Sequence, residues 1–277
     1  MTRRIAYLGP QGTYTEEAAA QYAPDAQLVP YPTVKQAAAA VEAGEADEAV
    51  APIENSLYGS IVDILDFLIA AKRTVIRGEV LLPINHCLMA APSTKLEDVR
   101  FVLAHGQAIG QCGEYLAKHL SQAQLIAASS NAAAAQDVRG RIDAVAIGPK
   151  RAAGLYGLKV VAEGIQDSRT NITRFVVLAQ TDHGRTGKDR TSFCFDVKDM
   201  PGALYQCLRP IAERRINLTK IESRPTGDRL GRYIFLVDVE GHRTDPAVAA
   251  ALEALRGMTV MLKVLGSYPQ ASVPGRA

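Results

Sequence analysis

Tryptophan is absent from the 277 residues, and cysteine occurs only four times, with no Cys-x-x-Cys pair. The thiols stand far apart in the chain, at Cys87, Cys112, Cys194 and Cys207. This spacing argues against a disulfide framework and against a structural zinc site. The sequence also has no apolar run long enough to span a membrane and no signal-peptide pattern at its N-terminus. We therefore expect a cytoplasmic protein with reduced thiols.

An excess of charge of one sign is also missing. The formal net charge is +2 at neutral pH, which is too small to indicate nucleic acid or an anionic membrane as a partner. The glycine turn at 9–15 does not end in Gly-Lys-Ser/Thr, so a nucleotide P-loop is not expected. A dinucleotide fingerprint and a metal-ligand spacing of His and Cys are lacking as well. The sequence predicts a protein that handles a small molecule without a cofactor or metal.

The chain does contain a regular alternation of strand and helix patterns over residues 1–182. Apolar, strand-like runs such as 4–8, 101–104 and 142–148 alternate with alanine-rich helical stretches. This order predicts an α/β fold built from mixed, largely parallel sheets. Polar clusters fall beyond strand ends or at helix starts, which is where α/β sheets bind ligands. We expect a catalytic domain of two α/β lobes with a central cleft.

A second domain follows a change of pattern. The polar segment 183–190 contains two glycines and is typical of a linker. Residues 191–267 then have the order β-α-β-β-α-β, which predicts a ferredoxin-like antiparallel sheet with both helices on one face. The last stretch, 268–277, carries Pro, Gly and Ser and predicts a flexible tail.

The segment 167–175 combines the most reactive residue types near the mouth of a strand. It is polar at first and then enters a β-branched run. Strand alternation predicts Thr173 and Phe175 on one face and Arg174 on the other. Thr173 offers a hydroxyl, and Arg174 offers a planar cation that can grip a carboxylate with two hydrogen bonds. An ordinary strand threonine beside a solvated arginine is the alternative interpretation.

Polar residues also cluster at other strand ends and helix starts. They are Glu54, Asn55, Ser56, Gln107, Ser129 and Ser130. We expect these clusters to meet the turn 9–15 in one cleft, because ligands bind beyond the carboxyl ends of strands. A hydrogen-bonded turn explains 54–56 equally well. His86 lies inside an apolar run and is expected to be a core or hydrogen-bonded histidine rather than a catalytic one.

These motifs together resemble the prephenate dehydratase family over nearly the whole chain. The matching segments, in the family's order, are 9–15, 52–56 with Gly59, 171–175 with the Thr-Arg-Phe motif, and 201–204 and 217–225 with the two phenylalanine-binding motifs of an ACT regulatory domain. The departures are Gly106, Asn131, Tyr14 and Thr15, where the family commonly has Pro, Thr, Phe and Ser. They leave fine specificity open but not the reaction class. The resemblance includes no chorismate mutase segment, so we expect a monofunctional enzyme.

The resemblance implies a cofactor-free lyase that converts prephenate to phenylpyruvate. It gives Thr173 the role of donor to the departing hydroxyl, with Glu54 as one candidate proton source. It gives Arg174 the role of orienting a substrate carboxylate, while Asn55 and Ser129 are catalytic neutral donors. The other substrate-binding residues that it implies are Gly12, Thr13, Ser56, Ser130, Gln107, Asn171 and Phe175.

The resemblance also implies regulation by L-phenylalanine at a junction between two chains, in a homodimer or homotetramer. The residues concerned are Gly202, Ala203, Leu204, Asn217, Glu222, Ser223 and Arg224. Two alternatives stay open. The substrate could be arogenate, the aminated relative of prephenate. In a different class, the chain could be a two-lobed solute-binding module with an amino-acid sensor, although the missing export signal counts against that.

Overall fold

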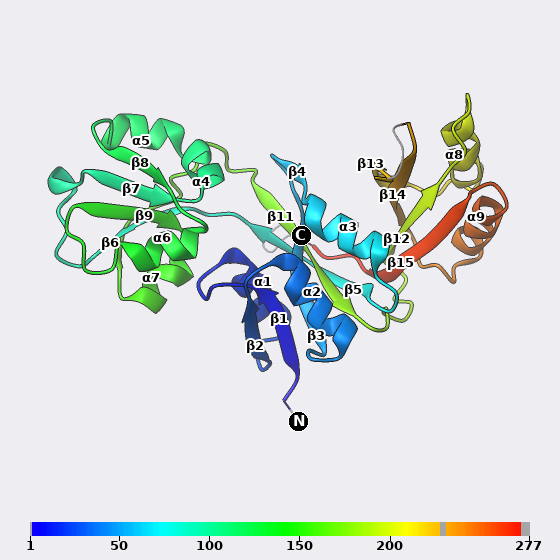
Figure 1. Cartoon of the computed structure of the whole chain (residues 1–277), viewed down its shortest axis with the longest axis horizontal. Helices are drawn as coiled ribbons and strands as arrows, with labels where there is room; N and C mark the ends of the chain where they lie inside the picture. The colour runs from blue at the N-terminus through cyan, green and yellow to red at the C-terminus, as the bar shows by residue number, and fades with distance from the viewer. Residues whose placement is uncertain (1, 228–230, 273–277) are drawn as a thin grey trace.

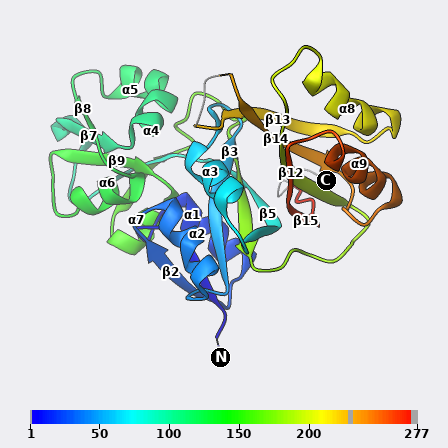
Figure 2. The ribbon, with the colours of Figure 1, turned by 45° about the vertical axis from the view of Figure 1, so that its right-hand side comes forward.

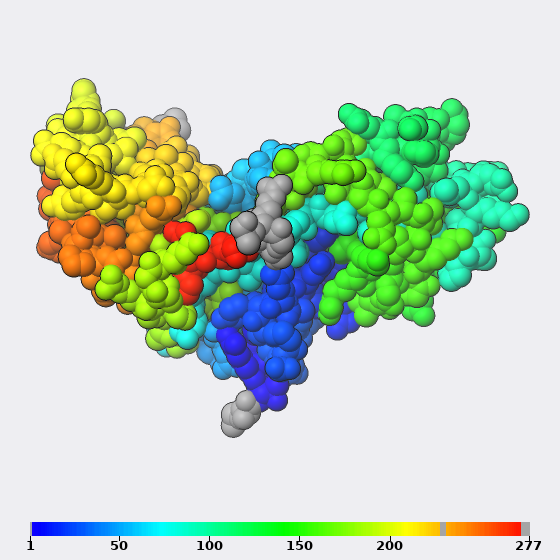
Figure 3. All heavy atoms as spheres, turned by 180° about the vertical axis from the view of Figure 1, so that it is seen from behind, coloured from blue at the N-terminus to red at the C-terminus, as the bar shows by residue number. Residues whose placement is uncertain are grey.

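The computed structural model describes residues 2–227 and 231–272. Three sheets define three bodies, which we call the first lobe (2–83 and 171–180), the second lobe (87–163) and the C-terminal domain (189–269). Figure 1 shows the first lobe in the centre, between the second lobe and the C-terminal domain. Seen from behind in Figure 3, the molecule is V-shaped, with the first lobe at the vertex. In the described residues, no helix is both long and apolar enough to cross a membrane.

The first lobe contains a mixed sheet in the order β2-β1-β3-β11-β5, with the short β4 paired to β3. Its strands are β1 (Arg4–Leu8), β2 (Gln27–Tyr31), β3 (Glu48–Asn55), β4 (Gly59–Ser60), β5 (Val75–Pro83) and β11 (Ile172–Ala179). Its helices are α1 (Tyr14–Tyr22), α2 (Val34–Ala43) and α3 (Val62–Ala70). Apolar residues of α1 pack on one face of this sheet, and those of α2 and α3 pack on the other. Figure 2 shows this lobe between the second lobe and the C-terminal domain from a second direction.

The second lobe contains a sheet in the order β10-β6-β9-β7-β8. Its strands are β6 (Cys87–Ala90), β7 (Phe101–Ala104), β8 (Gln124–Ala127), β9 (Ala144–Gly148) and β10 (Lys159–Glu163). Its helices are α4 (Gly106–Gln111), α5 (Gly113–His119), α6 (Asn131–Asp137) and α7 (Lys150–Tyr156), with the 3-10 turn η1 (Leu96–Asp98). Helices α4 and α5 cover one face of the sheet, and α6 and α7 cover the other.

Both sheets are mixed, as predicted, but they are less parallel than predicted. Parallel pairing is confined to β2-β1-β3 in the first lobe and β8-β7-β9 in the second. The chain crosses between the lobes twice, at 84–86 and at 164–171, whose last residue also belongs to the first lobe. The strands next to these crossings, β5, β6, β10 and β11, all pair antiparallel. The two lobes are therefore connected by two chain segments.

The C-terminal domain has the predicted βαββαβ order and an antiparallel sheet β13-β14-β12-β15. Its elements are β12 (Asp189–Asp196), α8 (Ala203–Glu213), β13 (Leu218–Pro225), β14 (Tyr233–Glu240), α9 (Pro246–Arg256) and β15 (Met261–Pro269). Both helices pack on one face. The other face shares a core with the first lobe through Cys194, Leu236, Leu265 and Tyr268. The two domains are therefore joined by a common apolar core rather than by a linker alone.

Two predicted boundaries need correction. Strand β12 begins at Asp189, inside the segment 183–190 that was expected to be a linker. Strand β15 continues to Pro269, because Tyr268 is fully buried in the core shared with the first lobe. The predicted flexible tail 268–277 therefore starts with two residues of a strand, and 273–277 lie outside the described residues.

Candidate active site

A cavity of about 400 Å³ lies between the two lobes, and we call it the cleft. Its lining comes from α1, β3, β4, β11, α4, the start of α6, and the two crossings between the lobes. The lining residues are Tyr14, Thr15, Pro52, Asn55, Tyr58, Gly59, Ser60, Ile61, Ile84, His86, His105, Gln107, Ala108, Gln111, Asn131, Asn171, Thr173 and Phe175. Of the described residues in this set, none is Lys or Arg. The cleft therefore offers a ligand neutral donors and a few apolar side chains.

Thr173 and Asn55 face each other across the adjacent strands β11 and β3. The amide nitrogen of Asn55 donates to Thr173 Oγ1 at 2.9 Å and to Asn171 Oδ1 at 2.7 Å. Among the described residues, the bond from Asn55 is the only side-chain hydrogen bond of the Thr173 hydroxyl. Because Thr173 accepts from Asn55, its own hydrogen is available to donate into the cleft.

The carboxamide oxygen of Asn55 holds the turn between β3 and β4. It accepts from the backbone N–H groups of Leu57 at 3.0 Å and Tyr58 at 3.2 Å. This arrangement is an Asx-type turn, in which the side chain replaces a backbone acceptor. All the hydrogen-bonding groups of Asn55 are therefore used to connect the turn at Tyr58 with Thr173 and Asn171.

A chain of side-chain hydrogen bonds continues from Asn171 to the wall of the cleft. Asn171 Nδ2 donates to Gln111 Oε1 at 2.9 Å, and the same oxygen lies 2.7 Å from His86 Nε2. His86 Nδ1 lies 3.0 Å from the Tyr14 hydroxyl, which is also 2.8 Å from the carbonyl of Asn85. The network joins α1, α4 and both crossings between the lobes.

The protonation state of His86 follows from its burial. The side chain is almost completely inaccessible, and burial lowers the pKa of the imidazole more than the bond to Gln111 raises it. The neutral ring donates from Nε2 to Gln111 Oε1, and its Nδ1 competes with the carbonyl of Asn85 for the single hydrogen of the Tyr14 hydroxyl. Burial also raises the pKa of Tyr14, so this phenol keeps its proton. His86 is thus the hydrogen-bonded histidine that the sequence indicates, and it also lines the cleft.

Arg174 does not lie in the cleft, contrary to the role that the family resemblance implies. Its guanidinium is buried on the opposite face of β11, 2.7 Å from both Glu79 and Asp238 and 2.7 Å from the Tyr268 hydroxyl. Glu54 lies on the same side, 3.3 Å from Lys220 and 3.5 Å from Arg174. Strand alternation is the reason, because Arg174 follows Thr173 in β11 and Glu54 precedes Asn55 in β3, so both point to the opposite face of the sheet. Neither charged side chain contacts Thr173.

Some of the remaining predicted substrate residues line the cleft, and others lie outside it. Gln107, Asn171 and Phe175 line the cleft, as expected. Ser56 instead binds the neighbouring backbone, donating to the carbonyl of Thr170 and accepting from the N–H of Ile172. It fixes the entry to β11 rather than presenting its hydroxyl to a ligand.

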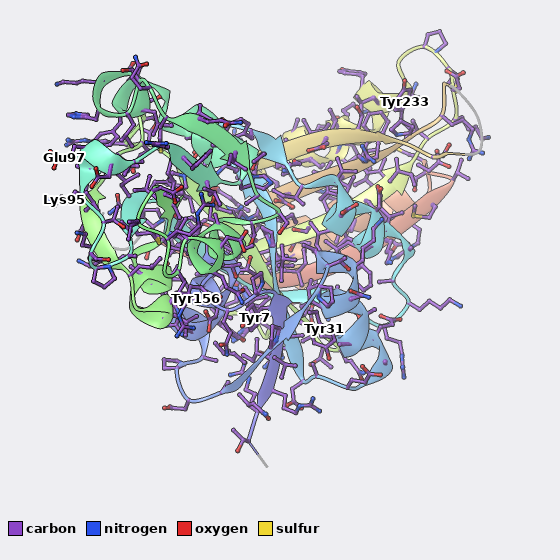
Figure 4. All side chains as sticks on the ribbon, turned by 60° about the vertical axis from the view of Figure 1, so that its left-hand side comes forward. Tyr7, Tyr31, Lys95, Glu97, Tyr156 and Tyr233 are labelled. Carbon is purple, nitrogen blue, oxygen red and sulfur yellow. The ribbon has the colours of Figure 1, made fainter. Side chains whose placement is uncertain are left out.

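A second cavity of about 730 Å³ lies at the glycine turn, also between the lobes. It contains Thr13, Ser129 and Ser130, and its walls include Tyr31 and Tyr156, labelled in Figure 4. Thr13 caps α1 and Ser130 caps α6 by accepting backbone N–H groups. The structure therefore separates these hydroxyls from the cleft that holds Thr173.

Gly12 lies where the first lobe contacts α7 of the second lobe. Its φ of +86° favours glycine, and a Cβ there would come within 3.3 Å of Ala152 and Tyr156 on α7. Its N–H donates to Glu16, which is also paired with Arg151 of α7 at 3.2 Å. Gly12 is therefore a packing residue between the lobes, and it does not line the cleft.

The predicted phenylalanine-binding residues are not brought together within one chain. Gly202, Ala203 and Leu204 form the start of α8, whereas Asn217 follows its end. An 11-residue helix separates the two segments, which corresponds to about 16 Å. Glu222 and Arg224 contact Ser60 and Asp66 of the first lobe instead, and Ser223 is exposed.

Sequence reasoning missed Gln111 and Tyr14 as parts of the site. Gln111 follows the predicted Gln107 by one helical turn, so its position on the same face was a usable signal. Tyr14 lies next to the predicted Thr13 but points to the other side of the helix start. In the described residues, no group of three or more His, Cys, Asp or Glu side chains is arranged to hold a metal ion.

Comparison with known proteins agrees with this architecture. Residues 5–183 match the family model described as prephenate dehydratase, and 192–257 match the ACT domain. The prephenate dehydratase of Mycolicibacterium vanbaalenii is 40% identical over 291 residues, covering 99% of this chain and 93% of that one.

Two solved structures are similar over the whole chain. The crystal structure of prephenate dehydratase from Arthrobacter aurescens in complex with L-Phe has a TM-score of 0.90 and 39% identity, covering 98% of this chain and 92% of that one. A protein described as GqqA, a novel type of quorum quenching acylase, has a TM-score of 0.89 and 32% identity, covering 97% and 98%. On the strength of the family model and the 40% identical relative, the chain belongs to the prephenate dehydratase family and carries an ACT domain.

Proposed function

We propose that this protein converts prephenate to phenylpyruvate, carbon dioxide and water in phenylalanine biosynthesis, with Thr173 as the donor to the departing hydroxyl. The observation that carries the proposal is the hydrogen bond from Asn55 to Thr173 Oγ1, which leaves the hydroxyl hydrogen available to a ligand in the cleft. The family membership of the chain supports the same reaction.

The chemistry asks little of the protein beyond positioning. The ring carboxylate leaves as carbon dioxide, and its bonding electron pair enters the ring. The carbon–oxygen bond at the opposite ring carbon breaks, and the departing oxygen takes up one proton to leave as water. Because a neutral alcohol is a weak acid, we propose that Thr173 stabilises this oxygen with a hydrogen bond and relays a proton from water, rather than acting as a strong acid. Glu54 is not used as a source, because it faces the C-terminal domain.

The neutral lining suits a substrate that must lose a carboxylate. Amide and hydroxyl donors on Asn55, Gln107, Asn131 and Asn171 can bind the dianion without a fixed cation beside it. A guanidinium on the departing carboxylate would stabilise the ground state more than the transition state and slow the reaction. We therefore propose that the absence of Arg and Lys from the described lining of the cleft favours decarboxylation.

We propose further that L-phenylalanine is the effector and binds between two chains. The start of α8 and the residue before β13 lie at opposite ends of a helix within one chain, so one ligand can contact both only if they come from different subunits. The L-Phe complex of the Arthrobacter aurescens relative supports this effector. The proposal requires at least a homodimer, which contains the junction twice, and a homotetramer of two such dimers contains it four times. We place the enzyme in the cytoplasm, where reduced cysteines are expected.

A hydrolytic function like that of the acylase relative is less well supported. Amide hydrolysis needs a nucleophile or a water activated by a neighbouring base. The side chain that contacts Thr173 is an amide donor, and His86 is engaged by Gln111 and Tyr14. Among the described residues, no base contacts the Thr173 hydroxyl.

One assay separates the candidate functions. The full chain is incubated with prephenate, with arogenate or with an N-acyl amide, and phenylpyruvate, phenylalanine or the free acid is measured. The proposal predicts turnover of prephenate, unaffected by a metal chelator. Preferential turnover of arogenate would identify the aminated substrate, release of the free acid would identify an acylase, and tight binding of prephenate without turnover would identify a solute-binding module.

A further inference from the structure

The strand that carries Thr173 is anchored by a buried cluster of charges shared with the C-terminal domain. Arg174, next in the chain, donates to Glu79 on β5, to Asp238 on β14 and to the Tyr268 hydroxyl on β15, each at 2.7 Å. All four side chains are nearly inaccessible to solvent. One residue of the catalytic strand thus contacts two strands of the other domain.

The contacts close into a ring inside the C-terminal sheet. Ser192 on β12 donates to Asp238 at 2.5 Å, and its hydroxyl lies 2.6 Å from that of Tyr268. Asp238 and Tyr268 therefore hold each other through Ser192 while both bind Arg174. A fork of donors fixed by acceptors on several strands has a single favourable orientation.

The cluster is balanced in charge. Arg190 reaches Glu79 at 3.5 Å and Asp238 at 3.9 Å, so two cations face two anions in the buried part. Burial alone raises the pKa of Asp238, but Arg174 and Ser192 more than offset it and hold the pKa below its usual value. The carboxylate is therefore ionised near neutral pH, and the pairing is permanent rather than titrating.

The position of this anchor matters because the neighbouring strand β3 bulges opposite it. The pairing of β3 with β11 skips Ile53 between Arg174 and Phe175, whereas β11 stays in register with β5 from Ile172 to Val177. At such a bulge the ladder is locally disrupted. Thr173 and Phe175, on either side of Arg174, both line the cleft, and the hydrogen bonds of Arg174 hold β11 where its pairing with β3 is interrupted.

We propose that Arg174 is a positioning residue and that Asp238 of the C-terminal domain, through Arg174, holds Thr173 in its catalytic position. The proposal rests on the function proposed above, since it assigns the support of the same site. It makes the C-terminal sheet a structural part of the active site and not only a regulatory attachment. It also gives the guanidinium a role different from binding a substrate carboxylate.

The test compares two isosteric changes of an interdomain aspartate. Asp238→Asn removes the charge that Arg174 needs. The control, Asp66→Asn, breaks the ion pair that Arg224 makes with α3 at 3.1 Å, which does not touch β11. Tyr268→Phe is a milder variant that removes one partner of Arg174 and keeps the ring in the core, in case Asp238→Asn does not fold.

Two readouts are measured on the full chain. We expect Asp238→Asn to lower kcat by about 10²-fold with little change in KM, because a small misplacement of a catalytic group has effects of this size. Tyr268→Phe should lower kcat less, and Asp66→Asn should stay within about threefold of the wild type. Hydrogen exchange of the peptide that covers 171–178 should speed up in Asp238→Asn and Tyr268→Phe but not in Asp66→Asn.

Each other outcome contradicts the proposal or the function beneath it. Equal effects of Asp238→Asn and Asp66→Asn on kcat and on exchange would show that the cluster only joins the domains and does not position Thr173. A further variant, Arg174→Lys, tests the guanidinium itself. A raised KM with unchanged kcat in this variant, while Asp238→Asn and Tyr268→Phe behave like the wild type, would indicate that Arg174 binds the substrate. If the wild type does not turn over prephenate, the proposed function fails, and the exchange of 171–178 still decides whether Asp238 anchors β11.

Discussion

Asn55 donates a hydrogen bond of 2.9 Å to the hydroxyl oxygen of Thr173, and this bond links the ends of two neighbouring strands at the wall of the cleft. The same side chain receives the N–H groups of the turn that contains Tyr58. The residue that orients the proposed catalytic hydroxyl therefore also holds the turn between β3 and β4, so a change in this turn would change the position of the donor.

Asn55→Asp tests this orientation, because it keeps the shape of the side chain and removes the N–H donor. The new carboxylate cannot donate to Thr173, and it also repels a dianionic substrate. We expect kcat to fall by about 10²–10³, as when an oriented donor is removed from other active sites, with a higher KM. The measurement is steady-state turnover of prephenate. Gln36→Glu, the same amide-to-acid change on the exposed start of α2, is the control and should have no effect.

His86 predicts a pH dependence of stability. Burial lowers the pKa of the folded-state imidazole, whereas the unfolded chain takes up the proton at about pH 6.5. Between the two values the unfolded state binds more protons, so this contribution to stability is complete above about pH 6.5 and is lost as the pH falls through the window to the folded pKa. Thermal midpoints of the wild type should therefore decrease on acidification more steeply than those of His86→Gln. The exposed His119→Gln is the control, and equal slopes for the wild type and His86→Gln would contradict the burial argument.

The effector junction predicts complementation between damaged chains. Leu204→Asp should disable the α8 half of the site and Asn217→Ala the β13 half. A mixed dimer of the two variants then contains one junction with both halves damaged and one with both intact. Phenylalanine binding, measured by calorimetry, should be absent from each variant alone and return after the two are unfolded and refolded together. No recovery on mixing would indicate that the two segments do not meet across chains.

The four cysteines are expected to be chemically silent in the folded protein. All four are buried. Burial raises the pKa of Cys112 to about 12 and that of Cys194 to about 11, and it raises those of Cys87 and Cys207 as well. The reactive thiolate is therefore scarce near pH 8. Iodoacetamide should leave the mass of the native protein unchanged and add four groups after denaturation. Rapid labelling of the native protein would show that a core opens.

Local sequence pattern predicted the elements of the fold and the face of β11 that carries Thr173 and Phe175. The alternation of side chains between the two faces of a strand depends only on neighbouring residues, so it can be predicted from the sequence. The role of Arg174 depends instead on partners 95 and 64 residues away, Glu79 and Asp238. Nothing near Arg174 in the sequence indicates that a second domain covers that face of the strand. The sequence therefore favoured a substrate carboxylate as the partner of the guanidinium.

The predictions for the glycine turn and for the C-terminal tail were wrong for related reasons. The hydroxyls of Thr13 and Ser130 are consumed by capping helices, and the cap pattern cannot tell on which side of the helix start the ligand lies. Tyr268 lies in a stretch that carries Pro and Ser, yet its ring fills the core between the domains and its hydroxyl binds Arg174. The composition of 268–277 reports only on neighbouring residues, whereas Tyr268 is held by contacts with residues far away in the sequence.

The most direct test of the account is the comparison of Thr173→Val with Thr173→Ser. Valine keeps the shape of threonine without the hydroxyl, and serine keeps the hydroxyl without the methyl group. We predict that Thr173→Val loses about 10²–10⁴ in kcat for prephenate, in keeping with the loss of a proton donor, while KM changes little and Thr173→Ser retains most of the activity. A near-normal kcat in Thr173→Val would contradict the claim that this hydroxyl assists the departing group.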